Sequence, residues 1–171
     1  MIRIGIVDDH AIVRNGLKQF FAEQVDLRVT GEAATGREAL DLVRRGDLDV
    51  VLMDLSMPDQ SGVDALAAIK ARFPELPVLI LSGFPEAHYA TTLLRQGASG
   101  YLNKECDPEE IANAIRLVSR GRRYISPAVA EQLGHLGSTA RAANAEAARL
   151  QQSLEAASRT LEDDSAQLAE L

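Results

Sequence analysis

Five short apolar runs, each separated from the next by a helix-length segment, constrain the fold of this chain more than any other feature. The runs are residues 2–7, 27–33, 49–53, 77–81 and 99–102. Apolar residues three or four apart in the intervening segments, such as Leu17, Phe20 and Phe21, indicate amphipathic helices. Continuous rather than alternating apolar runs are typical of strands covered on both faces of a parallel sheet. We therefore predict a doubly wound α/β fold with a five-stranded parallel sheet.

The last helix of this fold is marked at both ends. Asp107 is a capping residue, and Pro108 and two glutamates after it form a typical first helical turn. Gly121 follows the helical pattern and is a typical helix stop. The compact domain is therefore predicted to end near residue 122.

Length and composition suit one soluble domain with an extension. The 171 residues are 46% hydrophobic and 25% charged, and no apolar run approaches the roughly 20 residues that span a bilayer. Residues 1–7 are apolar but too short for the core of a signal peptide. We therefore expect a cytoplasmic protein without a membrane partner. The net charge of −7 gives no general attraction to nucleic acid.

The C-terminal segment has a different composition. Residues 138–171 are rich in alanine and contain no glycine, proline or aromatic residue. A repeat with spacings of three and four places apolar residues at every core position except Asp164. The core positions are Ala140, Ala143, Ala147, Leu150, Leu154, Ala157, Leu161, Asp164, Leu168 and Leu171. We predict a linker with a short helix over residues 123–137 and a long helix over residues 138–171 that forms a coiled coil. One amphipathic helix packed on its own domain, or a partly disordered tail, is the alternative.

Carboxylates follow two of the predicted strands. Asp8 and Asp9 come directly after the first strand, and Asp54 comes directly after the third. The carboxyl ends of parallel strands meet at one edge of a sheet, where ligands bind. Three carboxylates this close repel one another unless a cation lies among them, and oxygen ligands suit Mg²⁺ or Mn²⁺. The sequence therefore predicts a divalent cation here, the alternative being that Asp8 and Asp9 only cap the following helix.

The fourth and fifth predicted strands add polar groups at the same edge. Ser82 follows the fourth run, and Lys104 follows the fifth. Phosphoryl transfer to a carboxylate needs a positioned nucleophile, a metal ion and donors for the remaining charge. Asp54, the cation, Ser82 and Lys104 supply these parts together. Considered singly, Lys104 would be a solvated surface lysine and Ser82 a turn residue.

These residues lie in stretches that resemble the receiver domains of two-component response regulators. Four stretches match the family's motifs in order and spacing, namely IGIVDDHAIVRNGL, VVLMDLSMPDQSGVDAL, VLILSGF and GASGYLNKE. The resemblance implies a flavodoxin-like sheet of order 2-1-3-4-5 and a receiver domain over residues 1–122. It also implies that a sensor histidine kinase phosphorylates Asp54, and that Asp9 and Asp54 bind the metal directly. Asp8 would assist through water, and the backbone carbonyl of Ser56 would be a further ligand.

The same resemblance implies a switch. Lys104 would contact the phosphoryl group, and Ser82 would turn inward to bond a phosphoryl oxygen. Tyr101 would change its exposure as Ser82 moves, although a half-buried strand residue is the plainer interpretation. Such a domain assists its own phosphorylation and dephosphorylation but is not an enzyme in the usual sense.

Two further stretches are similar to the NarL/FixJ (LuxR-type) subfamily of transcriptional regulators. They are DHAIVRNGL near the start and GRRYISP at residues 121–127. Members of that subfamily normally continue into a helix-turn-helix DNA-binding domain. After Leu136 this sequence has no turn between two short helices and no Lys and Arg cluster. We therefore expect no direct DNA binding through this chain unless a domain is missing.

Three functions are consistent with these patterns. We favour a signalling switch that works as a homodimer in transcription regulation. The second is a magnesium-dependent aspartate-nucleophile phosphatase or phosphotransferase. Such enzymes usually carry a second acid two residues after the nucleophile, where this chain has Ser56. The third, an interaction module that is never phosphorylated, is disfavoured because every residue that the chemistry needs is present.

Overall fold

Strands and helices alternate along the first two thirds of the chain. The structure, a computed structural model, describes residues 1–59, 61–83 and 86–169. Its elements are β1 (Ile2–Val7), α1 (Ala11–Ala22), β2 (Leu27–Ala33), α2 (Gly36–Arg44), β3 (Val50–Met53), α3 (Gly62–Arg72), β4 (Val78–Ser82), α4 (Glu86–Arg95), β5 (Gly100–Asn103), α5 (Pro108–Val118) and α6 (Pro127–Ala169). Each predicted apolar run is a strand, although β3, β4 and β5 begin one residue later than predicted.

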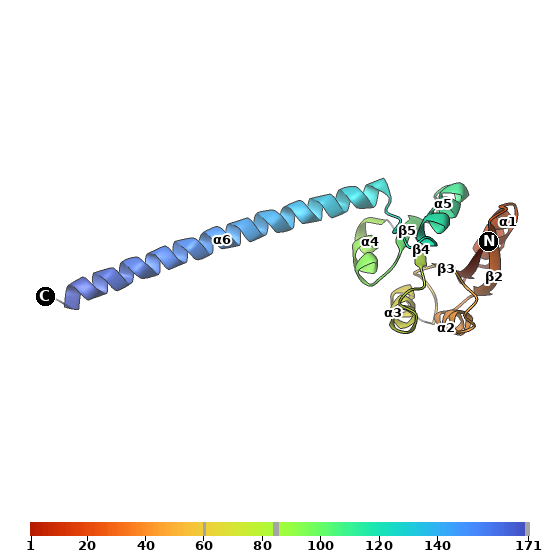
Figure 1. Cartoon of the computed structure of the whole chain (residues 1–171), viewed down its shortest axis with the longest axis horizontal. Coiled ribbons are helices and arrows are strands. Elements are labelled where there is room, and N and C mark those ends of the chain that lie inside the picture. The colour runs from red at the N-terminus through yellow and green to blue at the C-terminus, as the bar shows by residue number, and fades with distance from the viewer. Residues whose placement is uncertain (60, 84–85, 170–171) are drawn as a thin grey trace. The chain divides into compact units, whose positions relative to one another are not determined.

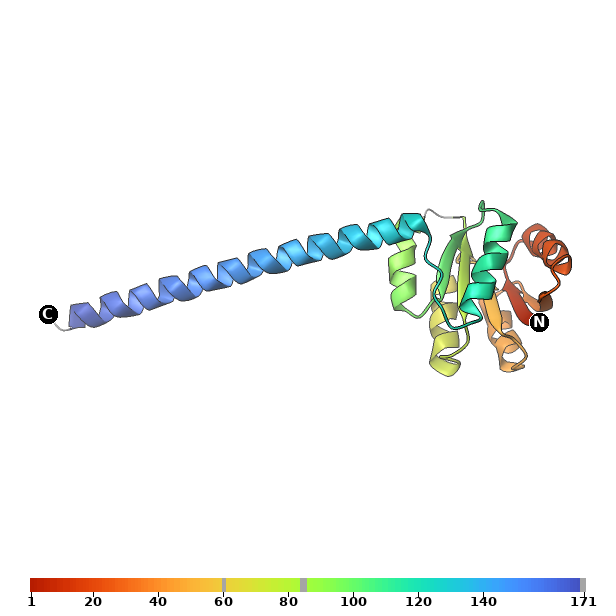
Figure 2. The same ribbon diagram turned by 45° about the horizontal axis from the view of Figure 1, so that its top comes forward.

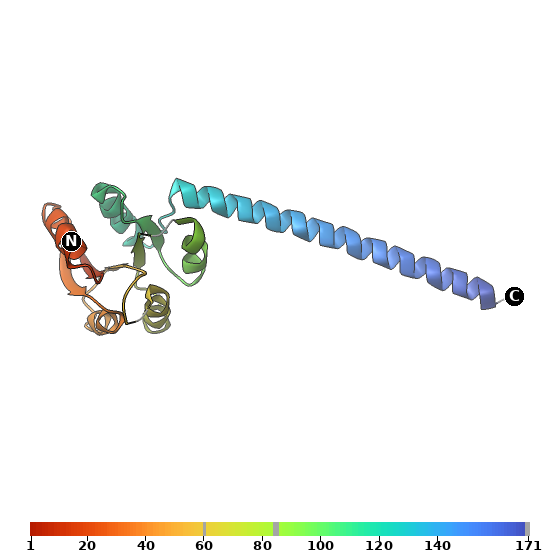
Figure 3. The ribbon, with the colours of Figure 1, turned by 180° about the vertical axis from the view of Figure 1, so that it is seen from behind.

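The five strands form one parallel sheet in the order β2-β1-β3-β4-β5. Helices α1 and α5 lie on one face of it, and α2 and α3 lie on the other (Figures 1 and 3). Helix α4 packs beside β5. The predicted doubly wound fold and its strand order are confirmed.

Burial on both faces explains why the strands are continuously apolar. Every residue of β3 and β4 is buried, and Ile4, Leu52 and Leu79 are at most 1% exposed. Each such side chain contributes roughly 1.5 to 3 kcal/mol when it leaves water. The two helical layers therefore hold the sheet, and hence its polar carboxyl edge, in a fixed position.

Helix α6 differs from the prediction of two separate helices. It runs from Pro127 to Ala169 without a break at Gly137 or Ser138 (Figure 2). One glycine inside a helix costs only about 1 kcal/mol relative to alanine, which is too little to end a long helix. The chain divides into two compact units, residues 1–130 and 131–171. In the part of the chain that the structure describes, no helix is both long and apolar enough to cross a membrane.

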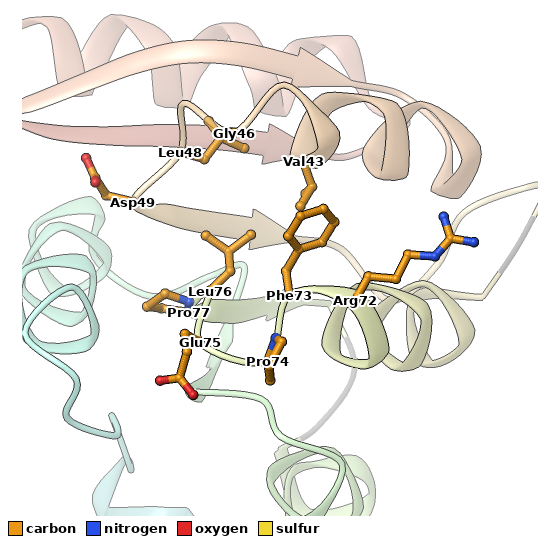
Figure 4. Close-up of a pocket in the computed structure, with 10 residues that line it drawn as sticks. All are labelled: Val43, Gly46, Leu48, Asp49, Arg72, Phe73, Pro74, Glu75, Leu76 and Pro77. Carbon is orange, nitrogen blue, oxygen red and sulfur yellow. The ribbon is translucent and has the colours of Figure 1, made fainter.

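A cavity of about 520 Å³ lies between the loops that lead into β3 and β4. The ring of Phe73 points toward Val43 (Figure 4). Leu76 and Leu48 lie beside this pair and also line the cavity. These loops are at the amino ends of the strands, opposite the edge at which ligands of parallel sheets usually bind. None of the described residues lining this cavity is a predicted site residue.

Candidate functional site

Backbone hydrogen bonds continue the sheet past the strand ends and align the polar residues there. The N–H of Asp54 donates to the carbonyl of Val7 over 2.8 Å, which places Asp54 beside the end of β1. The N–H of Lys104 donates to the carbonyl of Ser82 over 2.8 Å, which places Lys104, just after β5, beside the end of β4. The register of the sheet therefore brings residues from four strand ends to one place.

Lys104 lies between two buried carboxylates. Its Nζ is 2.7 Å from Asp8 Oδ2 and 3.1 Å from Asp54 Oδ2. Both aspartates are only 3% exposed. Burial raises the pKa of Asp54, although Lys104 opposes that shift. Burial alone would lower the pKa of Lys104, but Asp8 and Asp54 outweigh it and raise that pKa.

The carboxylates are close enough to share one cation. Asp8, Asp9, His10 and Asp54 each offer a ligand atom, and these atoms lie within 4.8 Å of one another. Asp54 Oδ2 is buried, and Lys104 Nζ, 3.1 Å away, is the positive charge beside it among the described residues. One ammonium does not balance three carboxylates, so the cluster keeps a net negative charge. Three carboxylate groups suit a hard divalent ion such as Mg²⁺ or Mn²⁺. The cluster therefore fits the predicted metal.

His10 belongs to this cluster and was missed by the sequence analysis. Its Nδ1 lies 3.0 Å from an oxygen of Asp8 and 3.0 Å from an oxygen of Asp9. Its backbone N–H donates to Asp8 Oδ1 over 2.8 Å. Its position directly after the two aspartates was the available signal, because a residue at a strand end shares that edge with its neighbours.

The remaining predicted residues, Ser56, Ser82 and Tyr101, differ in how deeply they are buried. A cavity of about 280 Å³ is lined by His10, Asp54, Ser56, Gly83 and Lys104. Ser56 is exposed at its rim. Ser82 is completely buried at the end of β4, and Gly83 rather than Ser82 is among the lining residues described. Tyr101 is 1% exposed, so it is buried rather than half-buried.

The turn after Asp54 folds back tightly on itself. The N–H of Gly62, the first residue of α3, donates to the carbonyl of Leu55 over 2.8 Å. A Cβ at residue 62 would lie 2.5 Å from the carbonyl oxygen of Asp54 and 2.6 Å from Leu55 Cα. Both atoms are backbone and cannot swing away. Glycine is therefore required for the turn that carries Ser56 past the carboxylates.

Comparison with known proteins places the same segment in one family. A profile of the response regulator receiver domain matches residues 4–116. The response regulator GacA of Pseudomonas viridiflava is 41% identical over 133 residues, which cover 78% of this chain and 62% of that protein. The transcriptional regulatory protein DegU of Brevibacillus brevis is 39% identical over 132 residues, covering 77% of this chain and 56% of that protein.

A solved structure agrees with these sequence matches. A two-component response regulator of the LuxR family from Aurantimonas sp. SI85-9A1 is 34% identical, with a TM-score of 0.74. The alignment covers 80% of this chain and 97% of that chain. The chain itself spans only 56% and 62% of the two curated relatives. On the matched segment, its fold and its acidic edge, this chain belongs to the response regulator receiver domain family, whose members are signalling switches rather than classical enzymes.

Proposed function

We propose that the compact domain is a phosphorylation switch in which Asp54 accepts a phosphoryl group from a sensor histidine kinase. The observation that carries this proposal is the buried Asp54 carboxylate beside Lys104 and two further aspartates. A carboxylate oxygen of Asp54 forms a bond to phosphorus while the bond to the donor breaks, and the electron pair leaves with the donor. The ammonium of Lys104 balances charge on the transferred group.

Four residues would hold the divalent cation. Asp9 and Asp54 would be direct ligands, Asp8 would assist through water, and the backbone carbonyl of Ser56 would complete the set. Held by these residues, Mg²⁺ or Mn²⁺ would supply positive charge against the phosphoryl oxygens. In this way the domain would assist its own phosphorylation and dephosphorylation.

Ser82 and Tyr101 would carry the switch from the phosphorylated residue. Ser82 would bond a phosphoryl oxygen, and Tyr101 would change its exposure in response. A phosphoaspartate adds charge and acceptor oxygens that favour one of two packings. Because Tyr101 is buried in this structure, the other packing would expose it. In the family's context, the output would be transcription regulation.

We further propose that α6 pairs with a second copy of the chain as a coiled coil. Leu150 and Leu154, two of the predicted core positions, are 62% and 70% exposed. Exposed leucines four residues apart on one helix are stabilised by burial against a partner helix. Phosphorylation would then act on the geometry or the strength of a homodimer.

An aspartate-nucleophile phosphatase or phosphotransferase is the second candidate. Its mechanism usually needs an acid two residues after the nucleophile. Ser56 occupies that position and lines the cavity beside Asp54. A hydroxyl cannot replace a carboxylate as a general acid or base near neutral pH. We therefore favour the switch.

The test is phosphorylation of the purified chain by a small-molecule phosphodonor with Mg²⁺, followed by intact-mass measurement. The wild-type protein should gain one phosphoryl group, and Asp54→Asn should gain none while keeping its fold by circular dichroism. Asp41→Asn, which changes an exposed aspartate on α2, is the matched control and should behave like the wild type. Incorporation that survives in Asp54→Asn would refute the assignment.

A further inference from the structure

Asp59 joins the turn after β3 to the start of a different helix. Its Oδ1 accepts a hydrogen bond from the N–H of Gly36 over 3.0 Å, and its Oδ2 accepts one from the N–H of Arg37 over 3.3 Å. Gly36 and Arg37 are the first two residues of α2. One carboxylate therefore bridges two elements that are more than 20 residues apart in sequence.

The start of α2 has its own capping residues, but their hydrogen bonds do not involve the N–H groups of Gly36 and Arg37. The Thr35 side chain accepts from the N–H of Glu38 over 3.1 Å, and the Glu38 side chain accepts from the N–H of Ala34 over 2.8 Å. The free N–H groups of a first turn need acceptors, and a negative charge there also suits the helix dipole. The Asp59 carboxylate, which lies outside the helix, supplies the acceptors and the negative charge.

The segment that Asp59 anchors also contains the predicted metal ligand Ser56. At one point this segment is tied to itself, through the N–H of Gly62 and the carbonyl of Leu55. Asp59 ties it at a second point to α2, three residues after Ser56. The Leu55–Gly62 hydrogen bond closes the base of the turn, and the contact of Asp59 with α2 is an additional tie in its exposed middle.

We propose that Asp59 is a positioning residue for the cation site. By holding the turn against α2, it keeps the Ser56 carbonyl at the acidic cluster and so sets the affinity for Mg²⁺. Asp59 is not one of the four described residues of the acidic cluster, so we assign it an indirect role through Ser56. The inference rests on the proposed function, because it assumes that the Ser56 carbonyl is a metal ligand.

The experiment compares Asp59→Ala, Asp59→Asn and Thr35→Ala in the full chain. Calorimetric titration gives the dissociation constant for Mg²⁺, and thermal unfolding in EDTA gives the stability of each variant. Thr35→Ala is the matched control because it removes a cap from the same helix end without touching the turn. Asp59→Asn tests charge against hydrogen bonding, since its amide oxygen still accepts one hydrogen bond.

We expect Asp59→Ala to weaken Mg²⁺ binding by about tenfold, the lower end of the roughly 10- to 100-fold loss for residues that orient metal ligands. Asp59→Asn should recover part of that loss. Thr35→Ala should stay within about twofold of the wild type in Mg²⁺ affinity, although it lowers the melting temperature as much as Asp59→Ala does.

Three results would overturn the proposal. Mg²⁺ affinity that falls equally in Asp59→Ala and Thr35→Ala would show that Asp59 only caps α2. Equal losses of Mg²⁺ affinity in Asp59→Ala and Asp59→Asn would show that the hydrogen bond kept by the asparagine does not hold the Ser56 carbonyl in place. Wild-type affinity in Asp59→Ala would show no role at all. The proposed function fails separately, if the wild-type chain binds no Mg²⁺ or if Asp54→Asn is still phosphorylated.

Discussion

Burial of the Asp54 carboxyl disfavours its ionised form. Burial raises its pKa above the ordinary value of 3.8, while the ammonium of Lys104 pulls it down. The folded protein therefore binds this proton more tightly than the unfolded chain does. Any stability from Asp54 is complete below the unfolded pKa and is lost as pH rises through the raised folded pKa.

The upward shift of the Asp54 pKa leads to a prediction for the stability of Asp54→Asn without metal. At neutral pH the variant should unfold at a higher temperature than the wild type, by an amount equivalent to about 1 kcal/mol, because it lacks the buried charge. The gain should shrink as pH is lowered through the raised pKa of the folded protein toward the ordinary value of 3.8, because the wild-type carboxyl then becomes protonated and loses its buried charge. Thermal unfolding in EDTA across this pH range measures it, and a pH-independent difference would contradict the explanation.

Lys104 should compete with the cation while assisting phosphorylation. Its ammonium lies within 3.1 Å of two carboxylates that would otherwise face the metal. Lys104→Ala should therefore bind Mg²⁺ up to about tenfold more tightly, because a like charge is removed. The same variant should be phosphorylated more slowly. Titration and intact-mass time courses measure the two effects, with Lys18→Ala as a control away from the site.

At the scale of elements, the turn between β3 and α3 requires close backbone contact at Gly62. Gly62→Ala should destabilise the protein by about 1 to 3 kcal/mol, because its Cβ meets backbone atoms of Asp54 and Leu55. It should also reduce Mg²⁺ affinity by distorting the turn that carries Ser56. Denaturant unfolding and titration give these two quantities.

Gly16 in the middle of α1 is the matched control for that substitution. A Cβ at residue 16 would meet no atom within 4 Å. Gly16→Ala should therefore stabilise the protein by about 0.5 to 1 kcal/mol, the ordinary gain within a helix. Equal effects of the two substitutions would show that close approach at Gly62 is unimportant.

Element boundaries show where local patterns are sufficient. The five strands and α5 were predicted to within one or two residues, because each is bounded by strong local signals such as Asp107 and Pro108. The continuity of α6 through Gly137 was not predicted. A glycine is a frequent stop signal, but its energy is small against that of a long run of good helix formers, so the neighbouring sequence decides.

At the scale of the whole molecule, α6 determines the expected oligomeric state. The full chain should be a dimer by light scattering without any ligand, because Leu150 and Leu154 gain by burial against a partner. Leu150→Glu combined with Leu154→Glu should shift it to a monomer, while Ala148→Glu, outside the core positions, should not. A monomeric wild-type chain at tens of micromolar would contradict the coiled coil, and beryllofluoride then tests whether the receiver domain drives pairing instead.

The sequence by itself determined the fold class and the acidic edge. Continuous apolar runs separated by amphipathic helices favour a parallel sheet covered by helices, because that arrangement buries both faces of its central strands. Parallel strands in turn bring their carboxyl ends together, so Asp8, Asp9 and Asp54 could be placed side by side without coordinates.

Only the tertiary structure decided which atoms face one another at that edge. The bridge from Lys104 to Asp8 as well as Asp54 and the tie from Asp59 to α2 join residues that are far apart in sequence. Such contacts depend on sheet register and side-chain direction. These differ by a few ångströms between arrangements with the same local pattern, so the local pattern cannot select among them.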